Sequence, residues 1–192
     1  MGRVRTVEDQ AILEAARNAF LERGQFATTR EIADVSGISQ AVLYQRFGSK
    51  DDLFFAAMTP PPPDIEHLLG NPPKSAAAAK RYLTGLSARL YAYFETVAPL
   101  MIQLAMHKSF TPQKIVGAHT PVKEINLEQS ISDRLRLLNN EGLIKVADVD
   151  AMTQMLVSLS HRDALAAALF KIPVRLEQQK EMINLIWNGV KP

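Results

Sequence analysis

Three glycines, at positions 24, 37 and 48, divide the first part of the chain into short segments, and a residue that can cap a helix opens each segment. The capping residues are Thr6 with Asp9, Thr28 with Glu31, Ser39, and Ser49 with Asp52. Side-chain oxygens at such positions accept hydrogen bonds from the first helical N–H groups, and glycine tolerates the positive φ of a helix end. These signals predict helices over about 7–23, 28–36 and 39–47 and a fourth from 49.

Longer helical segments follow a boundary at residues 60–63, where four consecutive prolines cannot continue a helix and are extended. This boundary fits a stiff joint, with a PxxP ligand for an aromatic groove as the alternative. After a second break at Asn71–Pro73, helices are expected over about 75–98, 99–109, 120–140, 148–170 and 173–188. Pro99 is expected in the first turn of its helix, where proline is tolerated. Because no strand alternation exceeds a few residues, the fold class is all-α, with domains at 1–58 and 64–192.

The composition argues against an enzyme. The 192 residues contain no Cys, which excludes disulfides, thiolate metal sites and Cys nucleophiles. The four His are not at metal-ligand spacing, so they do not indicate a zinc site. The sequence also lacks the GxSxG pattern of a serine nucleophile and the P-loop of a phosphate-binding enzyme. No metal and no cofactor are therefore expected.

The sequence predicts neither a membrane span nor a signal peptide. The longest charge-free stretch, residues 96–107, is shorter than the roughly 20 residues that span a bilayer. The N-terminus lacks the apolar core of a signal peptide, so we expect a cytoplasmic protein without a membrane partner.

Residues 29–48 have the spacing of a helix-turn-helix, in which two short helices cross steeply. Ala33 is small enough for the crossing, and Gly37 suits the positive φ of the turn. The residues expected to bury the inner faces are Ile32, Ile38, Leu43 and Phe47. An ordinary helical hairpin remains the alternative, because a net charge of +2 is too small to identify a nucleic-acid binder. No acidic residue lies between Val35 and Lys50, so this segment would not repel DNA.

The same segment resembles the DNA-binding domain of the TetR family. The runs that resemble it are Ala11–Ala16 with Ala19–Gly24, Thr28–Ala33 with Gly37–Ser39, and Leu43–Leu53, which looks like the family's LY-x-x-F-x-SK-x-x-L signature. The resemblance covers about a quarter of the chain, from Val7 to about Met58. It implies a transcriptional regulator, a repressor that leaves its double-stranded DNA operator when a small apolar or weakly polar effector enters the C-terminal domain.

The resemblance also implies a set of residues that contact DNA. These are Thr29, Arg30, Ser39, Gln40, Ala41, Val42, Tyr44, Ser49 and Lys50. Within this set, Gln40 would pair with adenine and Val42 with a thymine methyl group, while Tyr44 and Lys50 would hold phosphates. The chain departs from the family at 39–42, where a Lys followed by small residues is frequent, and its link from Gly24 to Ala33 is one residue shorter than is common. Arg3 and Arg5 are either a DNA-contacting arm or solvated tail charges.

A homodimer is expected, because one short recognition helix reads too few base pairs. The interface expected on the last two helices is Met152, Met155, Leu159, Ile183, Ile186 and Trp187. The alternative is that these apolar stripes fill the core of the monomer.

The effector pocket implied by the resemblance is formed by aromatic, Leu, Met and His side chains. They are Tyr82, Leu86, Leu90, Phe94, Met101, Leu104 and His107. An ordinary buried face is the alternative, since every helix needs one.

The alternative function for the whole chain is a helical interaction module that does not bind DNA. Such a module would leave the signature from Tyr44 to Lys50 unexplained. The basic excess between Lys74 and Lys123 suggests no function.

Overall fold

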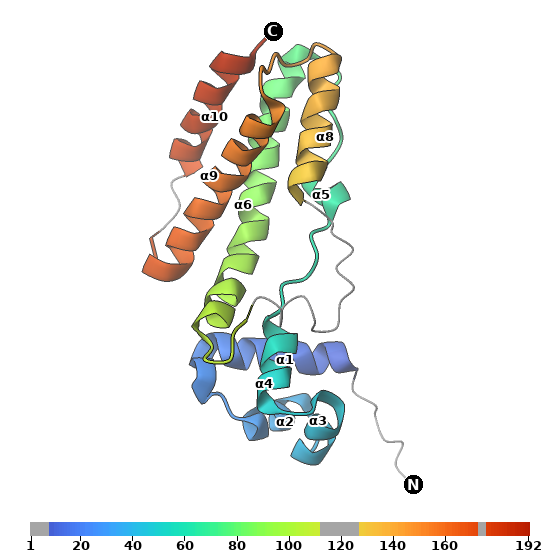
Figure 1. Cartoon of the computed structure of the whole chain (residues 1–192), viewed down its shortest axis with the longest axis vertical. Helices are drawn as coiled ribbons and strands as arrows, with labels where there is room; N and C mark the ends of the chain where they lie inside the picture. The colour runs from blue at the N-terminus through green and yellow to red at the C-terminus, as the bar shows by residue number, and fades with distance from the viewer. Residues whose placement is uncertain (1–7, 112–126, 173–175) are drawn as a thin grey trace. The chain divides into compact units, whose positions relative to one another are not determined.

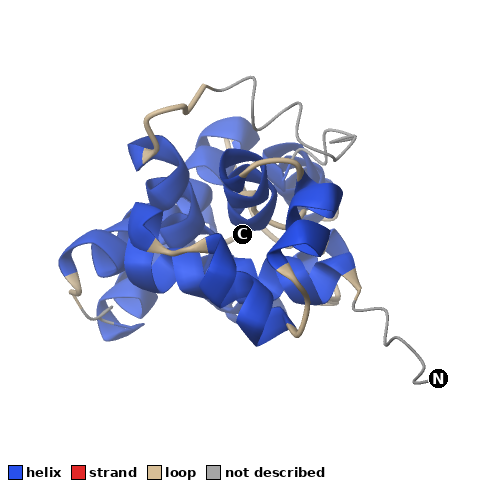
Figure 2. Ribbon diagram, turned by 90° about the horizontal axis from the view of Figure 1, so that it is seen from below, coloured by secondary structure: helices blue, strands red, loops and turns tan. Residues whose placement is uncertain are grey.

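The computed structural model describes residues 8–111, 127–172 and 176–192, and every regular element within these ranges is a helix (Figures 1 and 2). The all-α prediction is therefore confirmed for the described residues. The chain forms two compact units, one from residues 1–61 with 99–122 and the other from residues 62–98 with 123–192. The first unit thus includes a segment from Pro99 onward that the sequence had placed with the C-terminal domain.

The N-terminal unit begins with a series of short helices. They are α1 (Asp9–Arg23), the 3-10 turn η1 (Gly24–Phe26), α2 (Thr29–Ser36), α3 (Gln40–Phe47) and α4 (Lys50–Met58). The predicted capping boxes of α2 and α4 are both formed, and the Ser39 hydroxyl accepts from the Val42 N–H at the start of α3. The cap expected at Thr6 lies outside the described residues, and α1 follows Glu8 without a side-chain cap.

The core of this unit joins α1 and α4 to the end of a much longer helix, α6 (Ala76–Met106). Ile12, Ala16 and Phe20 recur along one face of α1 and are completely buried. Phe20 meets the ring of Phe54 edge to face, with the centroids 5.1 Å apart. From α6, Leu100 and Leu104 belong to the same buried cluster, so the end of α6 is part of the N-terminal core.

Pro99 lies inside α6 and does not begin a new helix as the sequence predicted. A proline in a helix has no N–H to donate to the carbonyl four residues earlier, here that of Glu95. The flanking Ala98 and Leu100 are strong helix formers and are both buried, which favours continuation. The two compact units divide between Ala98 and Pro99.

The second unit contains the first part of α6 and further helices. They are α5 (Ile65–Leu69), α8 (Leu127–Asn140), α9 (Val149–Phe170) and α10 (Leu176–Val190). The sequence missed α5 and placed Gly189 beyond the last helix, whereas Gly189 lies inside α10. The side chain of Arg89 donates to the carbonyls of Leu68 and Leu69, at 2.7 and 3.1 Å, at the end of α5. No helix in the described part of the chain is long and apolar enough to cross a membrane.

Candidate nucleic-acid interface

The turn between α2 and α3 has the geometry that a helix-turn-helix requires. Gly37 is left-handed, with φ 68°, and the Ile38 N–H donates to the Ala33 carbonyl at 3.0 Å. Ala33 is 1% exposed, as its place in the crossing predicts. The other expected inner residues are buried (Ile32 and Leu43) or pack partly buried against the same core (Ile38 and Phe47). The apolar side of both helices is thereby buried, and the opposite side of α3 faces solvent.

The exposed side of α3 is hydrogen-bonded to the start of α2 through Thr29. The Gln40 amide donates to the Thr29 Oγ1 at 3.0 Å, and the Tyr44 hydroxyl lies 2.9 Å from the same oxygen. Thr29 is buried, while Gln40 and Tyr44 are exposed. Three of the residues expected to contact DNA are thus brought together, with Thr29 beneath the other two. Ser39, Ala41 and Ser49 are also exposed, and Val42 is half-buried.

The cations near α3 differ in their partners. Arg46 pairs with Asp9 at 3.0 Å, so its charge is compensated. The Lys50 ammonium donates to the neutral Gln25 carbonyl at 2.7 Å, which leaves its charge uncompensated. Arg30 is exposed, and its side chain has no partner among the described residues. Arg30 and Lys50 are therefore the two predicted DNA-contacting residues that offer positive charge to a polyanion.

An ion pair and a capping box organise the segment that leads into α2. Arg23 pairs with Glu31, whose carboxylate also accepts the Thr28 N–H at 3.1 Å. These hydrogen bonds, from the Thr28 backbone first and then from the Thr28 hydroxyl and Arg23, lower the pKa of the Glu31 carboxyl below its usual value. These contacts favour the ionised form of Glu31, which pairs with Arg23 at the start of α2.

A second polar cluster joins the start of α4 to the segment after α6. The His107 Nε2 lies 3.7 Å from an Asp51 carboxylate oxygen, and the Ser109 hydroxyl donates to Asp51 at 3.1 Å. The Ser109 N–H donates to the His107 Nδ1 at 3.2 Å, and the His107 ring stacks on Phe54 with the centroids 4.4 Å apart. Asp51 directly follows Lys50, so this cluster contacts the first turn of α4, which carries Lys50. Sequence reasoning missed it, because no local pattern connects Asp51 with Ser109.

The residues expected to line the effector pocket divide between the two units. Tyr82, Leu86 and Leu90 are buried in the core of the second unit, where burial raises the pKa of the Tyr82 hydroxyl. Leu104 is buried in the N-terminal core, and His107 belongs to the cluster described above.

The remaining two expected pocket residues are only half-buried or exposed. Phe94 is half-buried, with its ring centroid 5.1 Å from that of His161, and Met101 is exposed. Within the described residues, no group of three His, Cys, Asp or Glu could hold a metal ion.

The residues expected at the dimer interface also separate into two groups. Met152 and Ile183 are 4% and 2% exposed and belong to the core of the second unit. Ile186 and Trp187 are partly buried and pack against that core. Met155 is 48% exposed and Leu159 is half-buried. The monomer core therefore accounts for part of the apolar stripes on α9 and α10.

Residues 12–57 match the family model described as "Bacterial regulatory proteins, tetR family". The search of curated proteins found no match. Among solved structures, the TetR-family regulator PfmR from Thermus thermophilus is 22% identical and has a TM-score of 0.56, with 97% of each chain covered.

Two further solved structures are similar over nearly the whole chain. A TetR-like transcriptional regulator from a Rhodococcus species is 23% identical, with 98% of each chain covered and a TM-score of 0.58. FadR from Bacillus subtilis, solved in complex with stearoyl-CoA, is 17% identical, with 95% of this chain and 99% of that chain covered and a TM-score of 0.62. These similarities show a common fold.

Proposed function

We propose that this chain is a DNA-binding transcriptional regulator with no enzymatic activity, a homodimeric repressor that a small molecule releases from its operator. The match of residues 12–57 to the tetR family model and the fold shared with solved regulators support this proposal. The observation that supports DNA recognition most directly is the exposed face of α3. There Gln40 and Tyr44 are held over Thr29, and Lys50 keeps an uncompensated charge. The proposed site of action is the cytoplasm.

In this proposal α3 enters the major groove of DNA, and the polar residues around α3 contact the phosphate backbone of the DNA. Gln40, Ala41 and Val42 face base edges. Arg30, Tyr44 and Lys50 contact phosphates, and the N-terminus of α4 at Ser49 offers backbone N–H groups to a further phosphate. Thr29 supports Gln40 and Tyr44 through its hydroxyl, and Ser39 caps the recognition helix.

The test is DNA binding by single variants, measured on the protein's own upstream sequence over a range of salt concentrations. Lys50→Gln should weaken binding about equally on all sequences and reduce the salt slope by about 1, because one phosphate contact is lost. Lys145→Gln, at an exposed lysine of the second unit, is the matched control and should change neither quantity. Gln40→Ala should relax the preference at one base pair, by less than the about 1–3 kcal/mol of a free bidentate contact, because Gln40 is already hydrogen-bonded to Thr29. An unchanged base preference in Gln40→Ala would refute this placement of α3.

We propose that the dimer forms through the apolar residues of α9 and α10 that the monomer core leaves exposed. Leu185 is 72% exposed on α10, and on α9 Met155, Leu169 and Phe170 are also exposed, with Leu159 half-buried. Leu185→Asp should convert the dimer to a monomer in sedimentation experiments. Leu137→Asp, at an exposed leucine of α8, is the control and should remain dimeric. A monomeric wild type would contradict the proposal.

The proposed effector is an apolar or weakly polar molecule that binds the second unit. FadR of Bacillus subtilis has this fold and was solved with stearoyl-CoA, whose acyl chain is apolar although its CoA part is charged, and this supports testing acyl-CoA esters first. An effector releases DNA only if it binds the DNA-incompetent state more tightly, and operator DNA must then weaken the effector by the same factor. Affinity for stearoyl-CoA measured with and without operator tests this; equal affinities would exclude it as the effector.

A further inference from the structure

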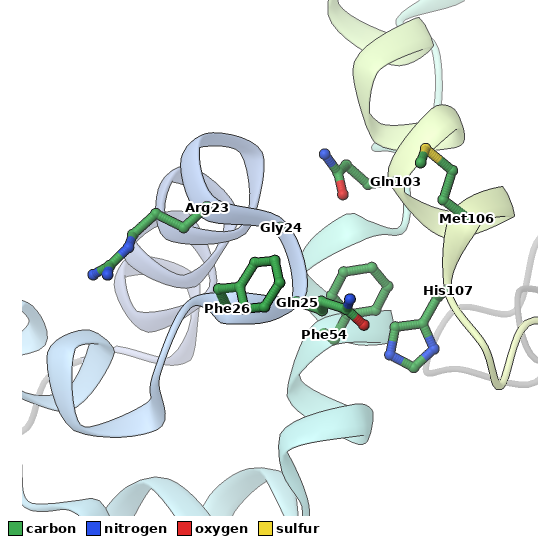
Figure 3. A pocket seen from close by; sticks show the side chains of 8 residues that line it. All are labelled: Arg23, Gly24, Gln25, Phe26, Phe54, Gln103, Met106 and His107. Carbon is green, nitrogen blue, oxygen red and sulfur yellow. The ribbon is translucent and has the colours of Figure 1, made fainter.

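We propose that the N-terminal unit has a small-molecule site of its own, which takes a small neutral aromatic compound and weakens DNA binding when it is filled. The site is a cavity of about 250 Å³ lined by the end of α1, the turn η1, α4 and the end of α6 (Figure 3). Its lining is Arg23, Gly24, Gln25, Phe26, Phe54, Gln103, Met106 and His107. This volume lies somewhat below the about 300–1,000 Å³ of pockets for drug-sized ligands, so the cavity suits a smaller ligand of one or two rings.

The apolar part of the lining is exposed to an unusual degree. Phe26 from η1 is 76% exposed and Met106 at the end of α6 is 78% exposed. Figure 3 shows both side chains, Phe26 on the η1 segment and Met106 on α6, with the ring of Phe54 to the right of the Phe26 ring. Two large apolar side chains beside one hollow favour an apolar occupant. Methionine sulfur and aromatic rings both make favourable contacts with aromatic groups, which favours an aromatic ligand.

The polar part of the lining favours a neutral ligand. Arg23 is paired with Glu31, and its guanidinium points away from the cavity in Figure 3. His107 already faces Asp51 and accepts the Ser109 N–H. The polar side chains that remain are the amides of Gln25 and Gln103, each of which offers both a donor and an acceptor. The site therefore suits one neutral hydrogen-bonding group on an aromatic ring.

The segment that forms one side of the cavity, residues 23–26, also contacts Lys50 and the capping box of α2, which lie at the proposed DNA-binding face. The carbonyl of Gln25 accepts the hydrogen bond from Lys50, and Arg23 holds Glu31 in the capping box of α2. The segment lies close to α6, because the Gln103 Oε1 is 3.7 Å from where a Cβ on Gly24 would be. A ligand that moves this segment would therefore change the presentation of Lys50 and of the start of α2. This coupling rests on the proposed DNA-binding function.

The experiment uses the full-length protein with ¹³C-labelled methionine methyl groups, and indole and benzamide as separate probes. Each probe should shift the Met106 methyl signal saturably and leave the signal of Met152, in the core of the second unit, unchanged. Phe26→Ala should weaken probe binding about tenfold, because the probe loses the apolar aromatic surface that it would cover. Phe26 lies outside the core, so this variant should fold, and Leu137→Ala serves as the control with unchanged binding. Affinity for the upstream DNA should fall severalfold with each probe in the wild type and stay constant in Phe26→Ala.

Several results would overturn the inference. One is no saturable shift at Met106 with either probe, and another is an equal shift in Phe26→Ala. Binding that leaves DNA affinity unchanged would remove the effector role. Self-association that Phe26→Ala abolishes would show that the cavity is an interface between two copies of the chain. Failure to bind DNA without any probe would refute the proposed function instead, while the Met106 signal would still report on the cavity.

Discussion

Replacement of Leu104 by alanine tests whether the end of α6 belongs to the N-terminal core. Leu104 is completely buried, and its neighbours in that core include residues of α1 and α4. Removing a fully buried leucine side chain costs about 2–5 kcal/mol, through lost transfer free energy and the cavity left behind. Because that cavity lies in the N-terminal unit, we expect Leu104→Ala to destabilise this unit selectively.

Native-state hydrogen exchange measures this effect element by element. A loss of about 2 kcal/mol or more corresponds to roughly a 30-fold or greater loss of amide protection, which we expect in α1 and α4 of Leu104→Ala. Leu86→Ala is the matched control, because Leu86 is equally buried on the same helix but lies in the core of the second unit. That variant should lose protection in α8 and α9 instead. The same pattern of loss in both variants would refute the assignment of Leu104 to the N-terminal core.

Three further predictions concern single positions. Pro99→Ala should raise the melting temperature, because alanine restores an N–H that can donate to the Glu95 carbonyl and a proline inside a helix costs about 3 kcal/mol; a lower melting temperature would contradict this. The lowered pKa of Glu31 means that its contribution to stability is present above the usual value of 4.5 and is lost as the pH falls through the folded-state value. Acid unfolding of Glu31→Gln should therefore depend less steeply on pH than that of the wild type, and equal slopes would argue against the capping box. Ala33→Leu should overpack the helix crossing, at a cost of about 1–3 kcal/mol, and abolish retention on DNA; full retention would show that the crossing has room.

Local rules in the sequence predicted the N-terminal helices well. The caps at Thr28, Ser39 and Ser49 and the positive φ of Gly37 are properties of a few neighbouring residues, and the structure confirms all of them. Pro99 was interpreted wrongly by the same kind of rule. A proline is most favourable in the first turn of a helix, but the buried residues on both sides of Pro99 are compatible with a continuous helix.

Features that depend on distant residues could not be predicted. The hydrogen bond from Lys50 to the Gln25 carbonyl joins residues 25 positions apart, and no local pattern specifies it. The apolar stripes of α9 and α10 were visible in the sequence, but a stripe does not distinguish a residue buried in the monomer, such as Met152, from an exposed one, such as Met155. The resemblance to a family provided roles for DNA-contacting residues, but it did not reveal that Thr29 is buried beneath Gln40 and Tyr44.

The hydrogen bond between Gln40 and Thr29 has a consequence for how sharply the protein distinguishes one base from another. A glutamine that reads adenine must first give up this internal partner, whose net contribution is about 0.5–1.5 kcal/mol. At a mismatched base the glutamine can keep its bond to Thr29, so a wrong base does not leave the amide without a partner. The preference for adenine is then smaller than the usual 1–3 kcal/mol by roughly the strength of that bond. Thr29→Val, which removes the acceptor, would accordingly sharpen the choice of base while it weakens binding to mismatched sites.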